Sequence, residues 1–259
     1  MRRKSTRREF FQGVLGTGLA YTMNPFLAKG LAEETNPIPP APKVVLARNE
    51  RFFGSGGQIN NVLVGKAVDD GIVRLTGQGS PAKAWASLFD PKDVVGLKLN
   101  CLAKKAFSPH LELVESIIKG LVSAGVKEGN IIVFDRYTRE LEEAGFRLRK
   151  SGGVQCLGTD ELAGGGYEPR PQVVGSVGSC FSRIVSSHCS ALISVPVLKD
   201  HDLSGVSVAM KNFYGVIHNP NKYHDNNCDP YIAELNTHPY IKNKLRLVIC
   251  DALVAQYNG

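Results

Sequence analysis

The apolar and polar positions divide the chain beyond residue 42 into alternating strand-like and helix-like segments. Residues 58–77 and 111–122 repeat apolar side chains at helical spacing, and the second segment forms one continuous apolar face. β-rich apolar runs, each of which predicts a buried strand, occupy residues 43–49, 93–101, 130–136, 191–198 and 245–253. This alternation predicts an α/β domain over residues 43–259, with a mostly parallel sheet and helices on both of its faces.

The clearest unit runs from residue 93 to residue 136. Ser108 and Pro109 are suited to the N-cap and the first position of a helix, and Gly125 is suited to the left-handed residue that ends it. A strand, a helix and a strand within about 40 residues predict a right-handed βαβ unit with parallel strands. The charged residues 138–150 predict a surface helix.

The remaining segments give weaker signals. Residues 151–181 are Gly-rich, with one strand expected at "QVVGSV", and "GGG" at 164–166 is interpreted as a flexible loop because no phosphate-loop lysine follows it. No covering element follows the last predicted strand. Either another layer covers that strand, or the sequence is a fragment of a longer chain.

The first 42 residues are interpreted as an export signal followed by a linker. Thr6-Arg7-Arg8-Glu9-Phe10-Phe11 matches a twin-arginine export signal, and we expect cleavage near Ala32 and a periplasmic or otherwise exported protein. A basic amphipathic helix that stays attached is the alternative. The weakly apolar run after the arginines contains Gly, Thr and Asn, so we expect no stable membrane span in the mature chain. Residues 33–42 contain four prolines and predict an extended linker.

Charge argues against nucleic-acid binding. The formal net charge is +7, but the first 32 residues carry +5 of it, so the remainder is close to neutral. No Arg/Lys stripe interleaved with aromatic residues occurs later in the chain. The expected macromolecular partner is instead the twin-arginine translocation machinery, on the strength of the Thr6–Phe11 pattern.

The six cysteines do not form a recognisable framework. None belongs to a C-x-x-C pair, which argues against a structural zinc site or an intrinsic iron–sulfur cluster. Cys101 and Cys250 occur in strand contexts and are interpreted as buried apolar residues. An exported protein can form disulfides, and Cys180 and Cys189 are the nearest in sequence, but spacing does not assign a pairing.

Polar side chains gather where the predicted strands end. In parallel α/β sheets, ligands bind beyond the carboxyl ends of the strands, so these residues predict a site there. "GLKLN" places Lys98 and Asn100, "VFDR" places Asp135 and Arg136, "ISVPVLKDHD" places Lys199, Asp200, His201 and Asp202, and "VICD" places Asp251.

The segment after Ser204 is expected to add a helix whose N-terminal amides face the same crevice, bringing Lys211, Asn212 and Tyr214. Lysines beside a helix start favour a phosphate or carboxylate ligand. Plainer interpretations are solvated lysines, aspartates that cap the helix, and Asn212 and Tyr214 that satisfy buried backbone groups. His218, His224, Asp225 and Asp229 lie in a polar loop that is either a solvated lid or a metal site, and the spacing fits no tight metal template.

"LISVPVLKDHDLSGVSVAMKNFYGV" resembles the Pro, Lys and His segment followed by Lys-Asn-x-Tyr-Gly of domain-of-unknown-function family 362. "VVGLKLN", the βαβ portion and "LRLVICDAL" are similar to that family in the same order. The resemblance implies an α/β domain in which Lys98, Lys199, His201, Lys211 and Asn212 matter. Some relatives carry a C-x-x-C-rich ferredoxin-like module, which this sequence lacks, and in such relatives the chain continues past the last strand.

Three hypotheses of function follow. The first is an exported enzyme acting on an anionic small molecule, with His201, Lys199 and Asp200 as catalytic residues. Its ligand-binding residues are Lys98, Asn100, Lys211, Asn212 and Tyr214. The second is a non-catalytic periplasmic binding or maturation protein that uses the same residues. The third is a redox accessory whose iron–sulfur cluster belongs to a partner. The cofactor, the metal and the reaction are left unassigned.

Overall fold

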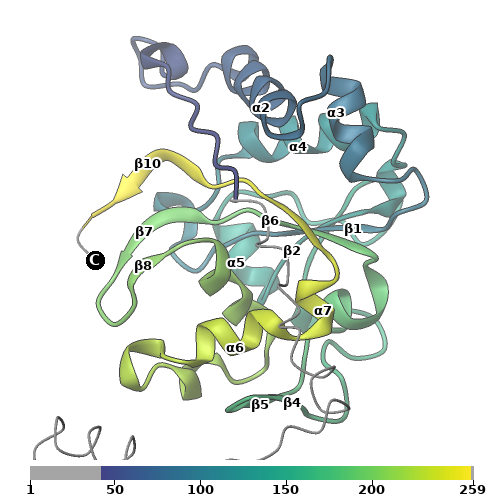
Figure 1. Cartoon of the computed structure of the whole chain (residues 1–259), viewed down its shortest axis with the longest axis vertical. Helices are drawn as coiled ribbons and strands as arrows, with labels where there is room; N and C mark the ends of the chain where they lie inside the picture. Colours follow the sequence, from purple (N-terminus) through teal and green to yellow (C-terminus); the bar gives the residue numbers. More distant parts are fainter. Residues whose placement is uncertain (1–41, 258–259) are drawn as a thin grey trace, which may run out of the picture. The chain divides into compact units, whose positions relative to one another are not determined.

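A five-stranded, wholly parallel sheet forms the centre of the fold, in the order β3-β2-β1-β6-β9 (Figure 1). Its strands are β1 (Val95–Lys98), β2 (Ile131–Asp135), β3 (Gln155–Gly158), β6 (Ala191–Ser194) and β9 (Leu245–Val248). This computed structural model describes residues 42–257. The export signal expected at residues 1–32 and the linker up to residue 41 lie outside the described residues.

Helices cover both faces of this sheet. On one face lie α2 (Asn61–Thr76), α3 (Pro81–Leu88) and α4 (Leu111–Ser123), and on the other lie α6 (Tyr231–Thr237) and α7 (Pro239–Lys242) (Figure 1). Successive side chains of a strand point to opposite faces. Ile131 and Val133 accordingly enter the core under α2 and α4, whereas Ile132 and Phe134 enter the core on the other face. The α/β fold with helices on both faces is confirmed.

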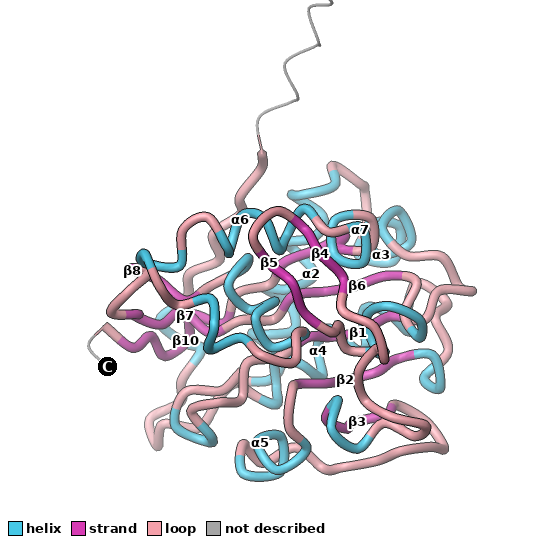
Figure 2. The backbone as a smooth tube through the Cα atoms, turned by 90° about the horizontal axis from the view of Figure 1, so that it is seen from below, coloured by secondary structure: helices cyan, strands magenta, loops and turns pink. Residues whose placement is uncertain are grey.

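After β6 and β9, which are neighbours in the central sheet, the chain continues into the strands of a second, smaller sheet. Its order is β10-β7-β8, with β7 (Val197–His201) parallel to β10 (Asp251–Gln256) and antiparallel to β8 (Gly205–Ser207). Figure 2 shows these three strands side by side at one end of the molecule. The sequence predicted single strands at 191–198 and 245–253, but each is split. Pro196 explains the first break, because proline has no N–H to donate to a sheet ladder.

Several other expectations need correction. Residues 43–49 form no strand, and Val44 and Leu46 are 91% and 73% exposed, because no neighbouring strand pairs with them. Helix α4 begins at Leu111 after His110, and the Ser108 hydroxyl donates to the Lys104 carbonyl instead of capping the helix. The helix expected at 138–150 is shorter, since α5 is Thr138–Glu143.

Residues 151–181 contain more structure than the sequence suggested. They include β3 and an antiparallel hairpin of β4 (Gln172–Val174) and β5 (Val177–Ser179). The segment expected to be a helix after Ser204 forms β8 and then a 3₁₀ helix, η6 (Ala209–Val216). The other short helical turns are η1 (Glu50–Phe52), η2 (Lys104–Ala106), η3 (Glu128–Asn130), η4 (Thr159–Glu161), η5 (Ile184–His188), η7 (Pro220–Tyr223) and η8 (Asn226–Cys228).

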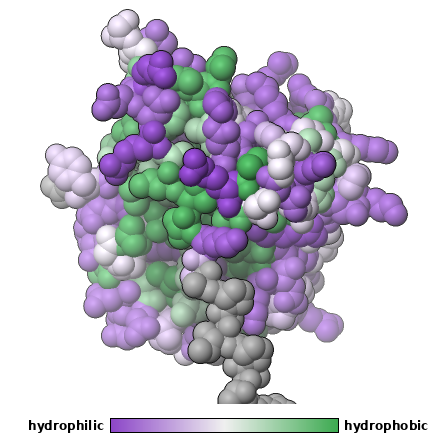
Figure 3. Space-filling view, turned by 45° about the horizontal axis from the view of Figure 1, so that its top comes forward, coloured by the Kyte–Doolittle hydropathy of each residue, from purple (hydrophilic) through white to green (hydrophobic). Residues whose placement is uncertain are grey.

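The surface of the described residues is mixed in polarity. Figure 3 shows a continuous apolar area surrounded by hydrophilic residues on the face turned to the viewer. Exposed apolar side chains include Val62 on α2 and Val254 on β10. None of the helices within residues 42–257 combines the length and the apolar character that a membrane crossing requires.

Candidate functional site

The strand order reverses between β1 and β6, and this reversal defines a switch point in the sheet. From β1 the chain moves outward to β2 and β3, then returns to the other side of β1 to form β6 and β9. Lys98, the last residue of β1, is the register partner of Ser194, the last residue of β6. Ligands of open parallel sheets bind beyond the carboxyl ends of the strands at such a point.

Lys98 fills part of this switch point with a buried ion pair. The residue is 1% exposed, and its Nζ lies 2.6 Å from Asp135 Oδ1 and 3.2 Å from Asn212 Oδ1. It also donates to the carbonyl of Leu99. A lysine ammonium has three hydrogens, so its donors are fully used. Gly215 leaves room for this amine, since a Cβ there would lie 2.6 Å from Lys98 Nζ.

The partners of Lys98 are themselves held in place. Asp135 accepts backbone N–H groups from Cys101 at 2.6 Å and Arg136 at 2.7 Å. The amide of Asn212 donates to the Lys98 carbonyl at 2.8 Å and to the Ser194 hydroxyl at 3.0 Å, which joins the ends of β1 and β6. We call Lys98, Asp135, Asn212 and Ser194 the switch-point network. The buried polar groups of this network are hydrogen-bonded to one another, so the network holds the strand ends rigidly in place.

Lys199 lies beside this network and is less completely bonded. Its Nζ donates to Asn100 Oδ1 at 3.0 Å and to the Phe107 carbonyl at 2.9 Å. Burial lowers the pKa of Lys199, with an opposing contribution from Asp135. Glu140 on α5 belongs to the same neighbourhood, and burial followed by the charge of Asp135 raises the pKa of its carboxyl group. Both groups are therefore biased toward their neutral forms.

A second group of basic side chains surrounds Lys211. Lys211 is 8% exposed, and its Nζ lies 3.1 Å from His224 Nε2 and 4.4 Å from the centre of the Tyr214 ring. The rings of His201 and His224 are stacked with centroids 5.6 Å apart, and His224 meets the edge of Tyr214 at 5.3 Å. We call Lys211, His201, His224 and Tyr214 the Lys/His cluster.

Protonation is disfavoured throughout the Lys/His cluster. Burial lowers the pKa of Lys211, and burial together with the charge of Lys211 lowers the pKa values of His201 and His224. Among the described residues, no carboxylate forms an ion pair with any of these three groups. The cluster therefore concentrates basic groups without a bonded counter-charge.

His201 has one committed nitrogen and one free nitrogen. Its Nδ1 accepts the backbone N–H groups of Leu203 and Ser204, both at 3.2 Å. The proton of the neutral ring is therefore on Nε2, which has no protein partner within the described part of the chain. Asp200 differs, because its carboxylate forms no hydrogen bond or ion pair with a described residue and lines a hollow of about 310 Å³ with Val206 and Gln256.

Tyr214 takes part through its ring and not through its hydroxyl. The hydroxyl donates to the Tyr223 carbonyl at 2.7 Å, and burial raises the pKa of this phenol. The ring face is directed at the Lys211 ammonium, a cation–π arrangement. Tyr214 therefore shapes the surroundings of Lys211 without offering a free hydroxyl.

Other strand-end residues are engaged in structural contacts. Asp251 accepts from the backbone N–H of His110 and lies 2.8 Å from its Nδ1, which links β10 to the start of α4. Arg136 donates to the His218 carbonyl at 2.6 Å, and its Nε is buried without a partner among the described residues. These two strand ends therefore do not join the Lys/His cluster.

Sequence reasoning missed part of this arrangement. His224 was expected only as a member of a polar loop, and Ser194 and Glu140 were not expected at all. The signal for Ser194 was Pro196, because a proline breaks the strand predicted at 191–198 and β6 ends at Ser194, in register with Lys98. The contact between His224 and Lys211 has no sequence signal, because the segment between them follows no helical or strand period.

Metal and disulfide chemistry gain no support from the geometry. Within residues 42–257, no group of three or more His, Cys, Asp or Glu side chains is placed to hold a metal ion. All six cysteines, which lie in this described range, are unpaired. Cys101 is buried as expected, but Cys250 is exposed.

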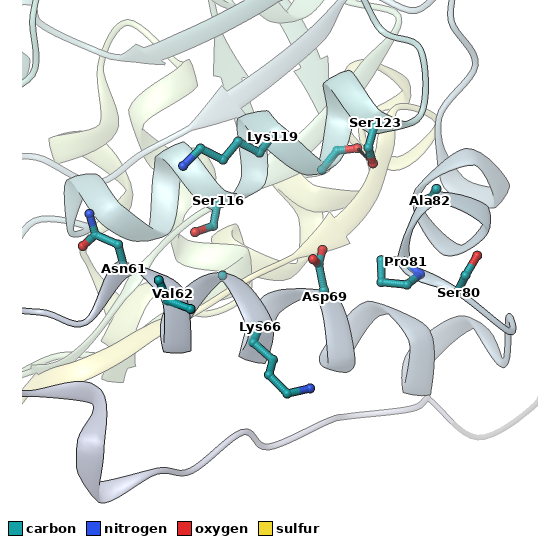
Figure 4. A pocket seen from close by; sticks show the side chains of 12 residues that line it. Asn61, Val62, Lys66, Asp69, Ser80, Pro81, Ala82, Ser116, Lys119 and Ser123 are labelled. Atoms are coloured by element: carbon teal, nitrogen blue, oxygen red, sulfur yellow. Dashed lines mark hydrogen bonds between the residues drawn. The ribbon is translucent and has the colours of Figure 1, made fainter.

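A larger hollow of about 600 Å³ lies elsewhere, between α2, α3 and α4 (Figure 4). Asp69 and Ser116 point into the space between α2 and α4, whereas Lys66 extends away from it. Asp69 accepts the Trp85 indole N–H at 3.1 Å, and Ser116 donates to the Glu112 carbonyl at 2.7 Å. The Asp69 bond joins α2 to α3 and the Ser116 bond stays within α4, so both inward polar groups are already bonded inside the protein.

Comparison with known families gives one match. The model of a domain of unknown function, DUF362, matches residues 95–259, a span that begins at β1 and includes both the switch-point network and the Lys/His cluster. A comparison with curated proteins finds no match.

Proposed function

Because the chain belongs to the DUF362 family, a family described by a domain and not by an activity, we propose a function from the geometry of the strand ends. The protein binds an anionic small molecule, such as a phosphate or a carboxylate, through Lys211, His201 and His224. Lys199, two residues before His201 on β7, is a further basic group, but its amine is bonded to Asn100 and the Phe107 carbonyl.

The uncompensated Lys/His cluster carries the proposal. Lys98 is buried but paired with Asp135 at 2.6 Å. Lys199 is buried without a carboxylate, but its amine donates to two oxygen acceptors. Lys211 is almost as buried but has an imidazole where a carboxylate would be expected. Burying an unpaired charge is costly, so an anion that supplied the missing charge would be bound favourably.

The other predicted ligand residues are already hydrogen-bonded to neighbouring protein groups. Lys98 and Asn212 spend their donors inside the switch-point network, and Asn100 accepts from Lys199. We therefore assign Lys98, Asn100 and Asn212 to positioning and not to direct contact with the anion. The free Nε2–H of His201 remains available to donate a hydrogen bond to the anion or, if the protein is an enzyme, to a substrate oxygen on which negative charge develops.

Export is part of the same proposal. The Thr6-Arg7-Arg8-Glu9-Phe10-Phe11 pattern supports a twin-arginine signal over residues 1–32, with Pro-rich residues 33–42 as a linker. A non-catalytic periplasmic binding protein would use the same cluster. Replacing His201 distinguishes the two alternatives. In a binding protein this change would alter only the affinity for the anion, whereas in an enzyme it would also abolish turnover.

Anion binding can be tested by calorimetry with inorganic phosphate, sulfate and citrate. Lys211→Met keeps the length of the side chain and removes its charge, so at least one of these anions should bind about tenfold or more weakly than to wild type. Lys83→Met removes an exposed lysine of α3 and should leave the affinity unchanged. Equal affinities in wild type and Lys211→Met, with both proteins folded by circular dichroism, would refute the assignment.

A further inference from the structure

Three lysines of the described residues are buried, and their side-chain amines differ in what they donate to. Lys98 donates to a carboxylate, an amide oxygen and a carbonyl. Lys199 donates to an amide oxygen and a carbonyl. The Lys211 amine has a single hydrogen-bond partner among the described residues, the His224 Nε2 atom at 3.1 Å. Only Lys211 therefore has a base, and no oxygen acceptor, against its amine in the described part of the chain.

The bonding of His224 directs a lone pair at that amine. His224 Nδ1 lies 3.1 Å from the Pro220 carbonyl, which can only accept, so Nδ1 must carry the hydrogen of the neutral ring. The other nitrogen, Nε2, is then unprotonated and faces Lys211 Nζ. His224 is therefore arranged to take a proton from the Lys211 ammonium.

The surroundings of Lys211 favour the neutral amine. Its side chain is 8% exposed and lies against the Tyr214 ring, and burial lowers its pKa. A lysine that is desolvated beside other basic groups is activated as a nucleophile, because its unprotonated form is populated nearer to neutral pH. Lys98 lacks this property because Asp135 pairs with it directly.

We infer that Lys211 is a nucleophilic lysine that forms an imine with the carbonyl group of an anionic aldehyde or ketone. The inference rests on the proposed function, because the Lys/His cluster would attract the anionic part of that compound. It deepens the function by assigning the substrate class and the residue that forms the covalent bond.

The step balances with the groups present. Lys211 gives one proton to His224 Nε2, and its Nζ lone pair then forms a bond to the carbonyl carbon while the C=O π pair moves to oxygen. An N–H proton passes to that oxygen and gives a neutral carbinolamine. His224 returns its proton as the C–O bond breaks, releasing water and leaving a protonated imine on Lys211.

Two neighbours suit this intermediate. The cationic imine nitrogen would lie over the Tyr214 ring, which already holds the Lys211 Nζ at 4.4 Å from its centre. His201, stacked on His224, presents a free Nε2–H that can donate to the anionic group or to the departing oxygen. Lys211 and Tyr214 come from η6, His201 from the end of β7, and His224 from the turn after η7.

The test is reductive trapping in the full chain. The protein is incubated with glyoxylate, an aldehyde that carries a carboxylate, and then with sodium borohydride, which converts an imine into a stable secondary amine. Peptide mass spectrometry measures the modified fraction at each lysine. Lys211 should be modified at least about tenfold faster than Lys83, an exposed lysine in the same sample.

Variants separate a nucleophile from an accessible surface group. Lys211→Arg keeps the positive charge and should abolish the fast modification, and His224→Gln should slow modification of Lys211 at least about tenfold because the base is lost. Propanal, a neutral aldehyde, should lose the preference for Lys211. Both variants are checked for folding by circular dichroism.

The outcomes distinguish this inference from the proposed function. Modification of Lys211 no faster than that of Lys83 overturns the inference. If calorimetry then still shows Lys211-dependent phosphate, sulfate or citrate binding, the proposed function stands without it. Fast modification by glyoxylate and propanal alike would also overturn the inference, because the compound would not need its anion.

Discussion

Lys98 and Lys211 are both more than nine-tenths buried, yet their partners give them different chemistry. Lys98 is 1% exposed and is neutralised by Asp135, while Lys211 is 8% exposed and faces His224 and the Tyr214 ring. A paired buried cation holds elements together, whereas an unpaired one is available to an anion or a carbonyl group. Burial alone therefore does not identify the functional lysine; the atom opposite each amine does.

The structural role of Lys98 gives a stability prediction. Lys98→Met leaves the Asp135 carboxylate buried without its cation, so the free energy of unfolding should fall by about 3–5 kcal/mol, measured by urea denaturation. Asp135→Asn should be destabilising for the converse reason. Because both single variants remove the same interaction, the double variant should cost clearly less than their sum.

An exposed pair serves as the control. Lys66 and Asp70 lie 2.8 Å apart on α2 with side chains that are 68% and 56% exposed. Lys66→Met should cost only about 0.2–0.5 kcal/mol, the usual worth of such a helix pair. A loss below about 1 kcal/mol in Lys98→Met would contradict the view that the switch-point network holds β1, β2 and β6 together.

At the scale of elements, periodicity predicts best where a segment is buried on a defined side. The helix expected at 58–77 is α2, and the strands expected at 93–101 and 130–136 are β1 and β2. Residues 43–49 have the composition of a strand but no neighbour to complete a ladder, and composition does not show this. Pro196 was visible in the sequence, but the sequence does not show that its strand resumes in a second sheet.

The position of the candidate site was predictable from the sequence, but the partner of each lysine was not. Strand-end residues of parallel strands must share one edge of the sheet, so Lys98, Asn100 and Lys199 were expected there. Which of them would be neutralised depends on distances between strands, such as the 2.6 Å between Lys98 and Asp135. The contact of His224 with Lys211 depends on loop geometry, which leaves no period in the sequence.

One contact between elements should make stability depend on pH. The hydrogen bond and charge of Asp251 raise the pKa of His110 above its ordinary value, and this pair links α4 to β10. A raised pKa in the folded state means that the contribution is complete below the unfolded value of about 6.5 and is lost as pH rises through the folded value. His110→Gln should therefore lose more stability at pH 5.5 than at pH 8.

The expected difference is on the order of 1 kcal/mol, because the imidazole is partly exposed and its charge is screened. Urea denaturation of wild type and variant at both pH values measures it. His188→Gln is the control, since His188 is exposed and forms no ion pair with the described residues. A loss in His110→Gln that is the same at both pH values would show that the contact is not charged.

At the scale of the whole molecule, the excess positive charge and the Lys/His cluster lie in different parts of the chain. The first 32 residues carry +5 of the net charge of +7, and the rest is nearly neutral. The basic groups of the Lys/His cluster are instead assembled by folding, from β7, η6 and the turn after η7. An export route that carries folded proteins would deliver this cluster already assembled, which is why we connect the N-terminal pattern to the site.

This proposal makes the position of the arginine pair decisive. The N-terminal sequence contains two such pairs, Arg2-Arg3 and Arg7-Arg8, and only the second is preceded by Thr6 and followed by Glu9-Phe10-Phe11. Replacing Arg7 and Arg8 together by lysine keeps the charge but removes the guanidinium groups, so the protein should remain in the cytoplasm. The same change at Arg2 and Arg3 should leave export intact. Cell fractionation measures both; equal export of the two double variants would mean that charge alone directs the chain, as in a general basic leader.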